Sequence, residues 1–109
     1  MRILFDQGVP APLRNAFVGI ATVETAFERG WSTLLNGELI AEAEKSFDVF
    51  VTTDKNLRYQ QNLSERKIAI VVLPTTRWPA LRSRAGEIAL VAANISVGAF
   101  VEIAASPSA

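Results

Sequence analysis

The chain contains no cysteine and no histidine among its 109 residues. Without cysteine, disulfide bonds, thiol nucleophiles and thiolate metal sites are excluded. Without histidine, a Ser-His-Asp triad and the usual zinc sites are excluded as well. The groups that remain for chemistry are carboxylate, amide, hydroxyl, lysine and arginine. The oxygen ligands among them suit Mg²⁺ or Mn²⁺ better than zinc.

The chain also lacks an excess of charge, because 11 basic residues balance 11 acidic ones. It therefore has no overall positive field of the kind that drives non-specific binding to nucleic acids, and any such affinity must come from a local patch. The longest uncharged run, 88–101, is too short to span a membrane. Arg2 and Asp6 interrupt the N-terminus, so no signal peptide is recognisable there. We expect a cytoplasmic protein without a membrane partner.

Short apolar runs alternate with helical patterns along the chain. Strands are expected at 2–5, 20–25, 49–53, 68–73 and 99–103. The third and fourth of these runs are almost continuously apolar, which indicates strands covered on both faces and hence a parallel sheet.

The helices expected between these strands define the fold class. They start after Pro10, cover 25–29, run from an N-cap at Asn36 to about Ser46, and run from near Pro79 to Ile95. Strands that alternate with helices predict an α/β fold, here a three-layer sandwich with a mostly parallel five-stranded sheet. We expect one domain over 1–104 and a flexible tail over 105–109.

Three acidic residues lie at or near the ends of the expected strands and helices of such a fold. Asp6 follows the first expected strand, Asp54 follows the third, and Glu38 lies in the first turn of the helix between them. Ligands of doubly wound sheets bind beyond the carboxyl ends of the strands. If the first and third strands are neighbours, Asp6 and Asp54 converge, and a cation is then needed to keep them ionised together. Mg²⁺ or Mn²⁺ would also activate a water for phosphodiester hydrolysis.

Neighbouring polar residues extend this site. Asn56 is a neutral oxygen ligand or a holder of a water, and Thr52 or Thr53 orients a carboxylate by hydrogen bonding. Residues expected to grip an RNA backbone or stack on a base are Lys55, Arg58, Tyr59 and Lys67. Each feature alone also fits ordinary structure: a turn aspartate, a solvated first-turn glutamate, a solvated polar loop.

Three stretches of the sequence carry a family resemblance. They are Ile3-Leu4-Phe5-Asp6-Gln7-Gly8-Val9-Pro10, Gly30-Trp31 followed by Asn36-Gly37-Glu38-Leu39, and Val51-Thr52-Thr53-Asp54-Lys55-Asn56-Leu57. Over most of its length the chain resembles the PIN-like domains, specifically the short bacterial group related to toxin–antitoxin ribonucleases. The Thr-x-Asp pattern that closes the third expected strand is the most specific element of the resemblance.

The resemblance implies a parallel five-stranded sheet and a Mg²⁺- or Mn²⁺-dependent endoribonuclease that cleaves single-stranded RNA. It implies Asp6, Glu38 and Asp54 as the catalytic, metal-binding triad. It further implies a toxin whose partner is an antitoxin protein, and a second copy of the chain is another candidate partner.

Two departures from the family pattern leave alternatives open. Asn56 stands where many relatives have a fourth acid, and Gln7-Gly8 stands where the short group often has Glu-Asn. One alternative is therefore a catalytically weak or inactive PIN-like binding module that uses the segment 55–67. Another is a phosphoacceptor receiver domain with Asp54 as acceptor, although Glu102 follows where a receiver requires a lysine.

Overall fold

The computed structural model describes residues 1–57 and 66–105. Its strands are β1 (Arg2–Phe5), β2 (Thr22–Thr25), β3 (Val49–Thr52), β4 (Ala69–Val72) and β5 (Phe100–Glu102). They form one sheet in the order β2-β1-β3-β4-β5, and every neighbouring pair is parallel. All five strands lie where the apolar runs predicted them. The end of the expected tail, 106–109, lies outside the described residues.

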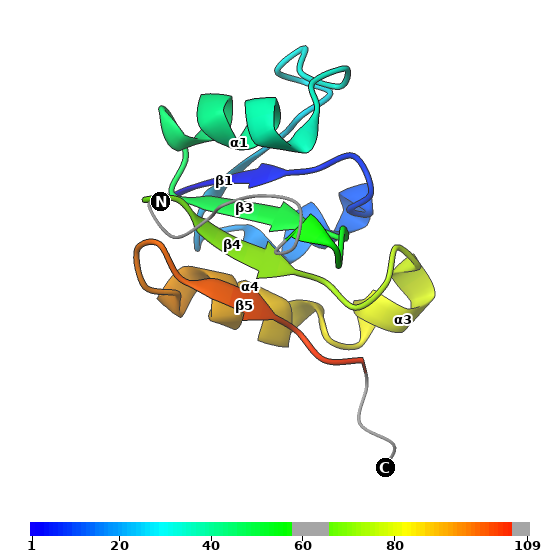
Figure 1. Cartoon of the computed structure of the whole chain (residues 1–109). Helices are drawn as coiled ribbons and strands as arrows, with labels where there is room; N and C mark the ends of the chain where they lie inside the picture. The colour runs from blue at the N-terminus through cyan, green and yellow to red at the C-terminus, as the bar shows by residue number, and fades with distance from the viewer. Residues whose placement is uncertain (58–65, 106–109) are drawn as a thin grey trace.

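The strand order creates a switch point between β1 and β3. The chain first moves from β1 to β2 on one side, then crosses back so that β3 pairs with the other side of β1. In Figure 1 the arrowheads of the labelled strands point toward the same side of the molecule. Crevices at such switch points, beyond the carboxyl ends of the strands, are where doubly wound sheets bind ligands. The sequence left open whether the first and third strands are neighbours, and the structure shows that they are.

Apolar side chains alternate between the two faces of the sheet and build a separate core on each. One core joins Leu4, Phe50 and Ile70 to the helix α1 (Asn36–Glu44). The other joins Ile3, Phe5 and Val51 to the 3₁₀ helix η1 (Ala11–Phe17) and to the helices α3 (Trp78–Arg82) and α4 (Ala85–Asn94). Figure 1 shows α1 and α4 on opposite sides of the strands. The three-layer α/β architecture follows from this double burial.

The sequence predicts the last helix as one continuous element, and this prediction is wrong. It is broken into α3 and α4 at Ser83 and Arg84. Arg84 has φ −109° and ψ 7°, outside the helical region. Its guanidinium donates to Glu87 at 2.8 Å and to the Ala104 carbonyl at 2.7 Å. Helical spacing of apolar residues could not reveal the break, because both pieces face the same core.

Two other predictions about helices are also wrong in detail. Leu35, not Asn36, is the N-cap of α1, and its N–H donates to the Glu38 carboxylate at 3.2 Å. The segment expected as a short helix at 25–29 is a hydrogen-bonded turn in which the Arg29 N–H donates to the Thr25 carbonyl at 3.1 Å. In both places a glutamate three residues into the segment satisfies a backbone N–H at its start.

No helix within the described ranges is long and apolar enough to cross a membrane.

Glu44 fastens the C-terminal end of α1 to the chain that leads into β4. Its carboxylate accepts the Lys67 backbone N–H at 2.6 Å and the Arg66 guanidinium at 3.0 Å. The hydrogen bond from Lys67 and then the one from Arg66 lower the pKa of Glu44 below its usual 4.5. Because the pKa of Glu44 is lower in the folded chain than in the unfolded chain, its charged carboxylate stabilises the fold at pH values above the unfolded-state pKa. This stabilisation is lost as the pH falls through the folded-state pKa.

We therefore expect Glu44→Gln to lower the urea midpoint near neutral pH and to matter less as the pH falls below about 4.5. Glutamine keeps the acceptor for the Lys67 N–H, so the difference isolates the charge. Urea unfolding of both proteins over a pH series measures it. A difference in midpoint that stays constant at every acidic pH would contradict the assigned pKa direction.

Candidate functional site

Thr52, the last residue of β3, lies at the centre of the switch-point edge. It is 0% exposed, and among the residues that the structure describes it is the one polar or charged residue that is buried. Its hydroxyl donates to Asp6 Oδ2 at 2.8 Å and accepts the backbone N–H of Asp54 at 3.1 Å. One buried hydroxyl thus holds both aspartates at the carboxyl ends of β1 and β3.

Asp6 is fixed by its own loop as well as by Thr52. Its backbone N–H donates to the Val51 carbonyl at 2.9 Å, which continues the pairing of β1 with β3 by one residue. Its Oδ1 accepts the backbone N–H of Gln7 at 2.8 Å. Asp6 is half-buried. Its carboxylate is therefore oriented from two sides while part of it stays open to solvent.

Asp54 starts the loop that leaves the sheet after β3. Its Oδ1 accepts the backbone N–H of Asn56 at 2.9 Å, and its carbonyl accepts the N–H of Leu57 at 3.3 Å. Leu57 is fully buried in the α1-side core and anchors the far end of this turn. Lys55 and Asn56 between them are exposed. Asp54 therefore makes the hydrogen bonds of an ordinary turn aspartate and also lies at the candidate site.

Glu38 lies at the same edge but is committed to the start of α1. The helix runs antiparallel to the strands, so its first turn lies near their carboxyl ends (Figure 1). The Gln7 side chain connects the two regions, because its Nε2 donates to the Ser32 carbonyl at 2.9 Å in the loop before α1. One carboxylate oxygen of Glu38 accepts the Leu35 N–H.

The donor chemistry of this edge fits a hard divalent cation. A carboxylate offers about four lone-pair positions, and the hydrogen bonds from Gln7 and Thr52 use only some of those on Asp6. Hydroxyl and amide donors that orient carboxylates are typical of the surroundings of metal ligands. Within 1–57 and 66–105 no three acidic side chains come close enough to form a metal-binding group. Thr52 joins the Asp6 carboxylate to the backbone of Asp54, whereas the Glu38 carboxylate accepts the Leu35 N–H at the start of α1.

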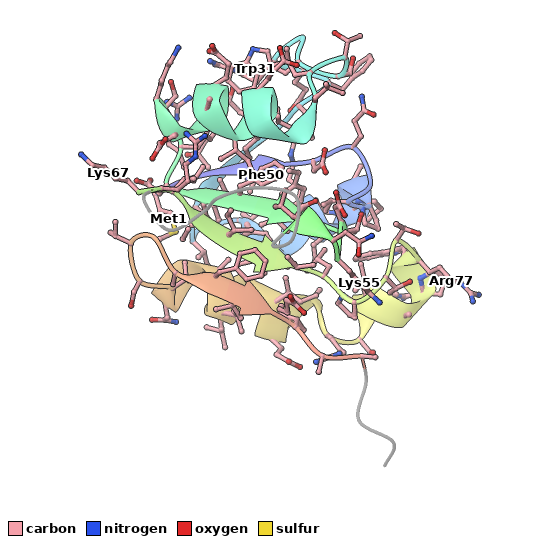
Figure 2. The ribbon with its side chains drawn as sticks, viewed as in Figure 1. Met1, Trp31, Phe50, Lys55, Lys67 and Arg77 are labelled. Carbon is pink, nitrogen blue, oxygen red and sulfur yellow. The ribbon has the colours of Figure 1, made fainter. Side chains whose placement is uncertain are left out.

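The residues expected to contact substrate are distributed differently. Lys55 lies at the site edge and lines a hollow of about 260 Å³ with residues that follow β4 and β5, among them Pro74 and Ala104. Lys67 precedes β4 and lies at the opposite end of the sheet, near Met1, whereas Lys55 and Arg77 lie at the site end (Figure 2). Arg58 and Tyr59 lie outside the described residues.

Gly8 is required by the close approach of two loops at this edge. A Cβ on Gly8 would lie 2.3 Å from Thr53 Oγ1 and 3.7 Å from Thr76 Cγ2. Thr53 is β-branched and stiff about its first side-chain torsion, so it has little freedom to move away. Thr53 thus has a steric role, because its side chain fills the space beside Gly8. The hydroxyl that orients the Asp6 carboxylate belongs to Thr52.

We expect Gly8→Ala to destabilise the fold by about 1–3 kcal/mol, the usual range for an overpacked position. The double variant Gly8→Ala/Thr53→Ala removes the clashing hydroxyl and is expected to recover most of this loss. Chemical denaturation of the four proteins in the cycle gives the coupling between the two positions. An equal loss from Gly8→Ala in both backgrounds would show that Thr53 is not the obstacle.

Two residues at this edge of the sheet are not among the site residues that the sequence predicts. Gln7 departs from the family pattern in the sequence, and in the structure its side chain links the Asp6 loop to the loop before α1. Phe27 is exposed beside Asp6, in a turn that begins Thr25-x-x-Glu28. That spacing is a capping-box pattern, and it is the one sequence signal that could have predicted a firmly held turn here.

Comparison of the chain with models of protein families, with curated proteins and with solved structures finds no match.

Proposed function

We propose that the chain is a PIN-like endoribonuclease that depends on Mg²⁺ or Mn²⁺ and cleaves single-stranded RNA. The observation that carries the proposal is the Thr52 hydroxyl, which ties Asp6 to the backbone of Asp54 at the switch point of a parallel sheet. A buried hydroxyl whose donor and acceptor both serve acidic residues supports a site in which the two carboxylates act together.

Asp6 and Asp54 are the residues that would hold the cation. The cation would supply the charge that offsets the developing negative charge of the phosphoryl group. Glu38 would complete the site if its carboxylate released the Leu35 N–H, which water can replace at a solvated helix start. Lys55, exposed on the adjoining turn, would hold an RNA phosphate, and Asn56 beside it would bind the cation or a water held by the cation. As a ribonuclease of the toxin type, the chain would have an antitoxin protein as its partner.

The experiment that tests this proposal measures metal binding and RNA cleavage on the same preparation. Calorimetric titration with Mn²⁺ reports the site, and a labelled unstructured RNA incubated with Mn²⁺ or Mg²⁺, with and without EDTA, reports the reaction. We expect binding and cleavage together, both removed by EDTA. Binding without cleavage would reject the enzyme and favour a PIN-like binding module. Cleavage that persists in EDTA would reject the metal site.

The strand order favours one other function to be tested. The order β2-β1-β3-β4-β5 is that of flavodoxin-like sheets, in which an aspartate after β3 also lies at the switch point. A phosphoacceptor receiver would then use Asp54, although Glu102 and Ile103 stand where it requires a lysine after β5. Incubation with acetyl phosphate and Mg²⁺, read by intact mass, distinguishes the two. A stable gain of one phosphoryl group, lost in Asp54→Asn, would favour the receiver.

A further inference from the structure

A hollow of about 360 Å³ lies beside the candidate metal site, on the β2 side of β1. It is lined by Asp6, Gln7, Val9, Ala11, Thr25 and Phe27. Its volume falls in the lower part of the range found for small-molecule sites. Phe27 forms one wall and is 77% exposed, although a phenyl ring left in water gives up the gain from burial. An exposed aromatic ring at the wall of a hollow that also contains a candidate metal ligand points to a bound molecule.

The turn that presents Phe27 is firmly built. The Thr25 N–H donates to Glu28 Oε1 at 2.9 Å, and the Glu28 N–H donates back to Thr25 Oγ1 at 3.0 Å. Arg14 of η1 pairs with the same Glu28 carboxylate. The hydrogen bond from Arg14 is the largest cause of the lowered pKa of Glu28, so this carboxylate stays charged at neutral pH.

Ala26 fixes the direction of the turn. It is fully buried, its N–H donates to the Phe5 carbonyl at 2.9 Å, and its own carbonyl accepts the Trp31 N–H at 2.8 Å. Because Ala26 occupies the inward position, Phe27 is held on the outside. A ring presented on a bonded turn can stack on a ligand with little further loss of conformational entropy.

The lining fits the flat face and polar edge of a nucleobase better than it fits a phosphate. None of its described residues is lysine or arginine, so a lone anion would find no cation there. The phenyl ring, Val9 and Ala11 provide an apolar wall, as bases stacked on aromatic side chains require. The Gln7 amide nitrogen is engaged by Ser32, while within the described ranges its oxygen accepts no hydrogen bond and remains for the edge of a base.

Asp6 belongs both to this hollow and to the pair held by Thr52. A phosphate at the candidate metal site would therefore have an adjoining base next to Phe27. We propose that the hollow is a base-binding subsite for single-stranded RNA, in which the base stacks on Phe27 and lies against Gln7. This inference rests on the proposed ribonuclease function and adds where the substrate is held.

The test uses the full chain and a short single-stranded RNA that carries one 2-aminopurine, whose fluorescence is quenched on stacking. Binding is measured in Mn²⁺ by stopped-flow mixing, in the time before the RNA is cleaved, for the wild type, Phe27→Ala and Phe27→Trp. We expect Phe27→Ala to weaken RNA binding by about 5- to 150-fold and to remove the quenching, since one stacked base contributes on that order. Phe27→Trp is expected to keep both, and Mn²⁺ affinity is expected to stay unchanged in all three proteins.

The matched control is Leu90→Ala, which removes a 61% exposed apolar side chain from α4 that does not line the hollow. It is expected to leave RNA binding unchanged. If the wild type binds RNA in Mn²⁺ and Phe27→Ala binds it equally well, the subsite is rejected and the proposed function stands. If the wild type binds no RNA in Mn²⁺, the proposed function fails and the subsite with it. If Phe27→Ala keeps RNA affinity but dissociates a dimer in sedimentation, the ring is a protein contact and the subsite is rejected.

Discussion

Asp54→Asn is expected to reduce Mn²⁺-dependent RNA cleavage by on the order of 100-fold or more, the usual cost of removing one group that stabilises a transition-state charge. The substitution is nearly isosteric. The side-chain oxygen of asparagine can still accept the Asn56 N–H, and the backbone N–H bonded to Thr52 is unchanged. Loss of activity in a folded protein would therefore come from loss of the negative charge, not from a rearranged loop.

Cleavage rates and Mn²⁺ titrations are to be compared with those of Glu42→Gln. Glu42 pairs with Lys45 on a solvated part of α1, so this control removes one carboxylate charge away from the site. The double variant Asp6→Asn/Asp54→Asn is expected to lose little more activity than either single variant, because groups that act as a unit are not additive. Wild-type cleavage in Asp54→Asn, or an equal loss in Glu42→Gln, would contradict the assigned role.

Thr52→Val is expected to weaken Mn²⁺ binding by about 10- to 100-fold, the range found when a partner that orients a metal ligand is removed. It is also expected to lower the free energy of unfolding by about 1–3 kcal/mol. Valine fills the same space but leaves Asp6 Oδ2 without its donor and the Asp54 N–H without its acceptor. Calorimetry measures the first effect, and urea denaturation without metal measures the second.

The matched control at this position is Thr52→Ser. Serine keeps the hydroxyl and deletes one buried methyl group, so it is expected to lose about 1 kcal/mol of stability while it retains Mn²⁺ affinity. Opposite ranking of the two variants in metal affinity would show that packing at Thr52, rather than its hydroxyl, maintains the site. Equal affinity in Thr52→Val and the wild type would remove Thr52 from the proposed site.

The fold class was predictable because it depends on local patterns. Val49–Thr52 and Ala69–Val72 are buried on both faces, and a run of apolar residues records that burial directly. The break at Arg84 was not predictable. Arg84 donates there to the Ala104 carbonyl, 20 residues away, and apolar spacing contains no information about such a partner.

The candidate site was predictable in part for the same reason. Asp6 and Asp54 were recognisable as residues that end strands, and a strand end is a local feature. Glu38 was placed correctly in the first turn of a helix, but its engagement at the helix start depends on the side-chain rotamer that reaches Leu35. Lys67 was grouped with Lys55 by proximity in sequence, yet the strand direction places it at the opposite end of the sheet (Figure 2).

By itself, the sequence determined the chemistry that is open to this protein and the kind of sheet that carries it. With neither cysteine nor histidine, carboxylate, amide, hydroxyl, lysine and arginine groups remain, and continuous apolar runs indicate a parallel sheet. The tertiary structure alone decided that β1 and β3 are neighbours, that Thr52 bonds Asp6 across 46 residues, and that Phe27 stands beside Asp6. Periodicity reports which side of an element is buried. Which elements then meet depends on contacts between residues far apart in the chain.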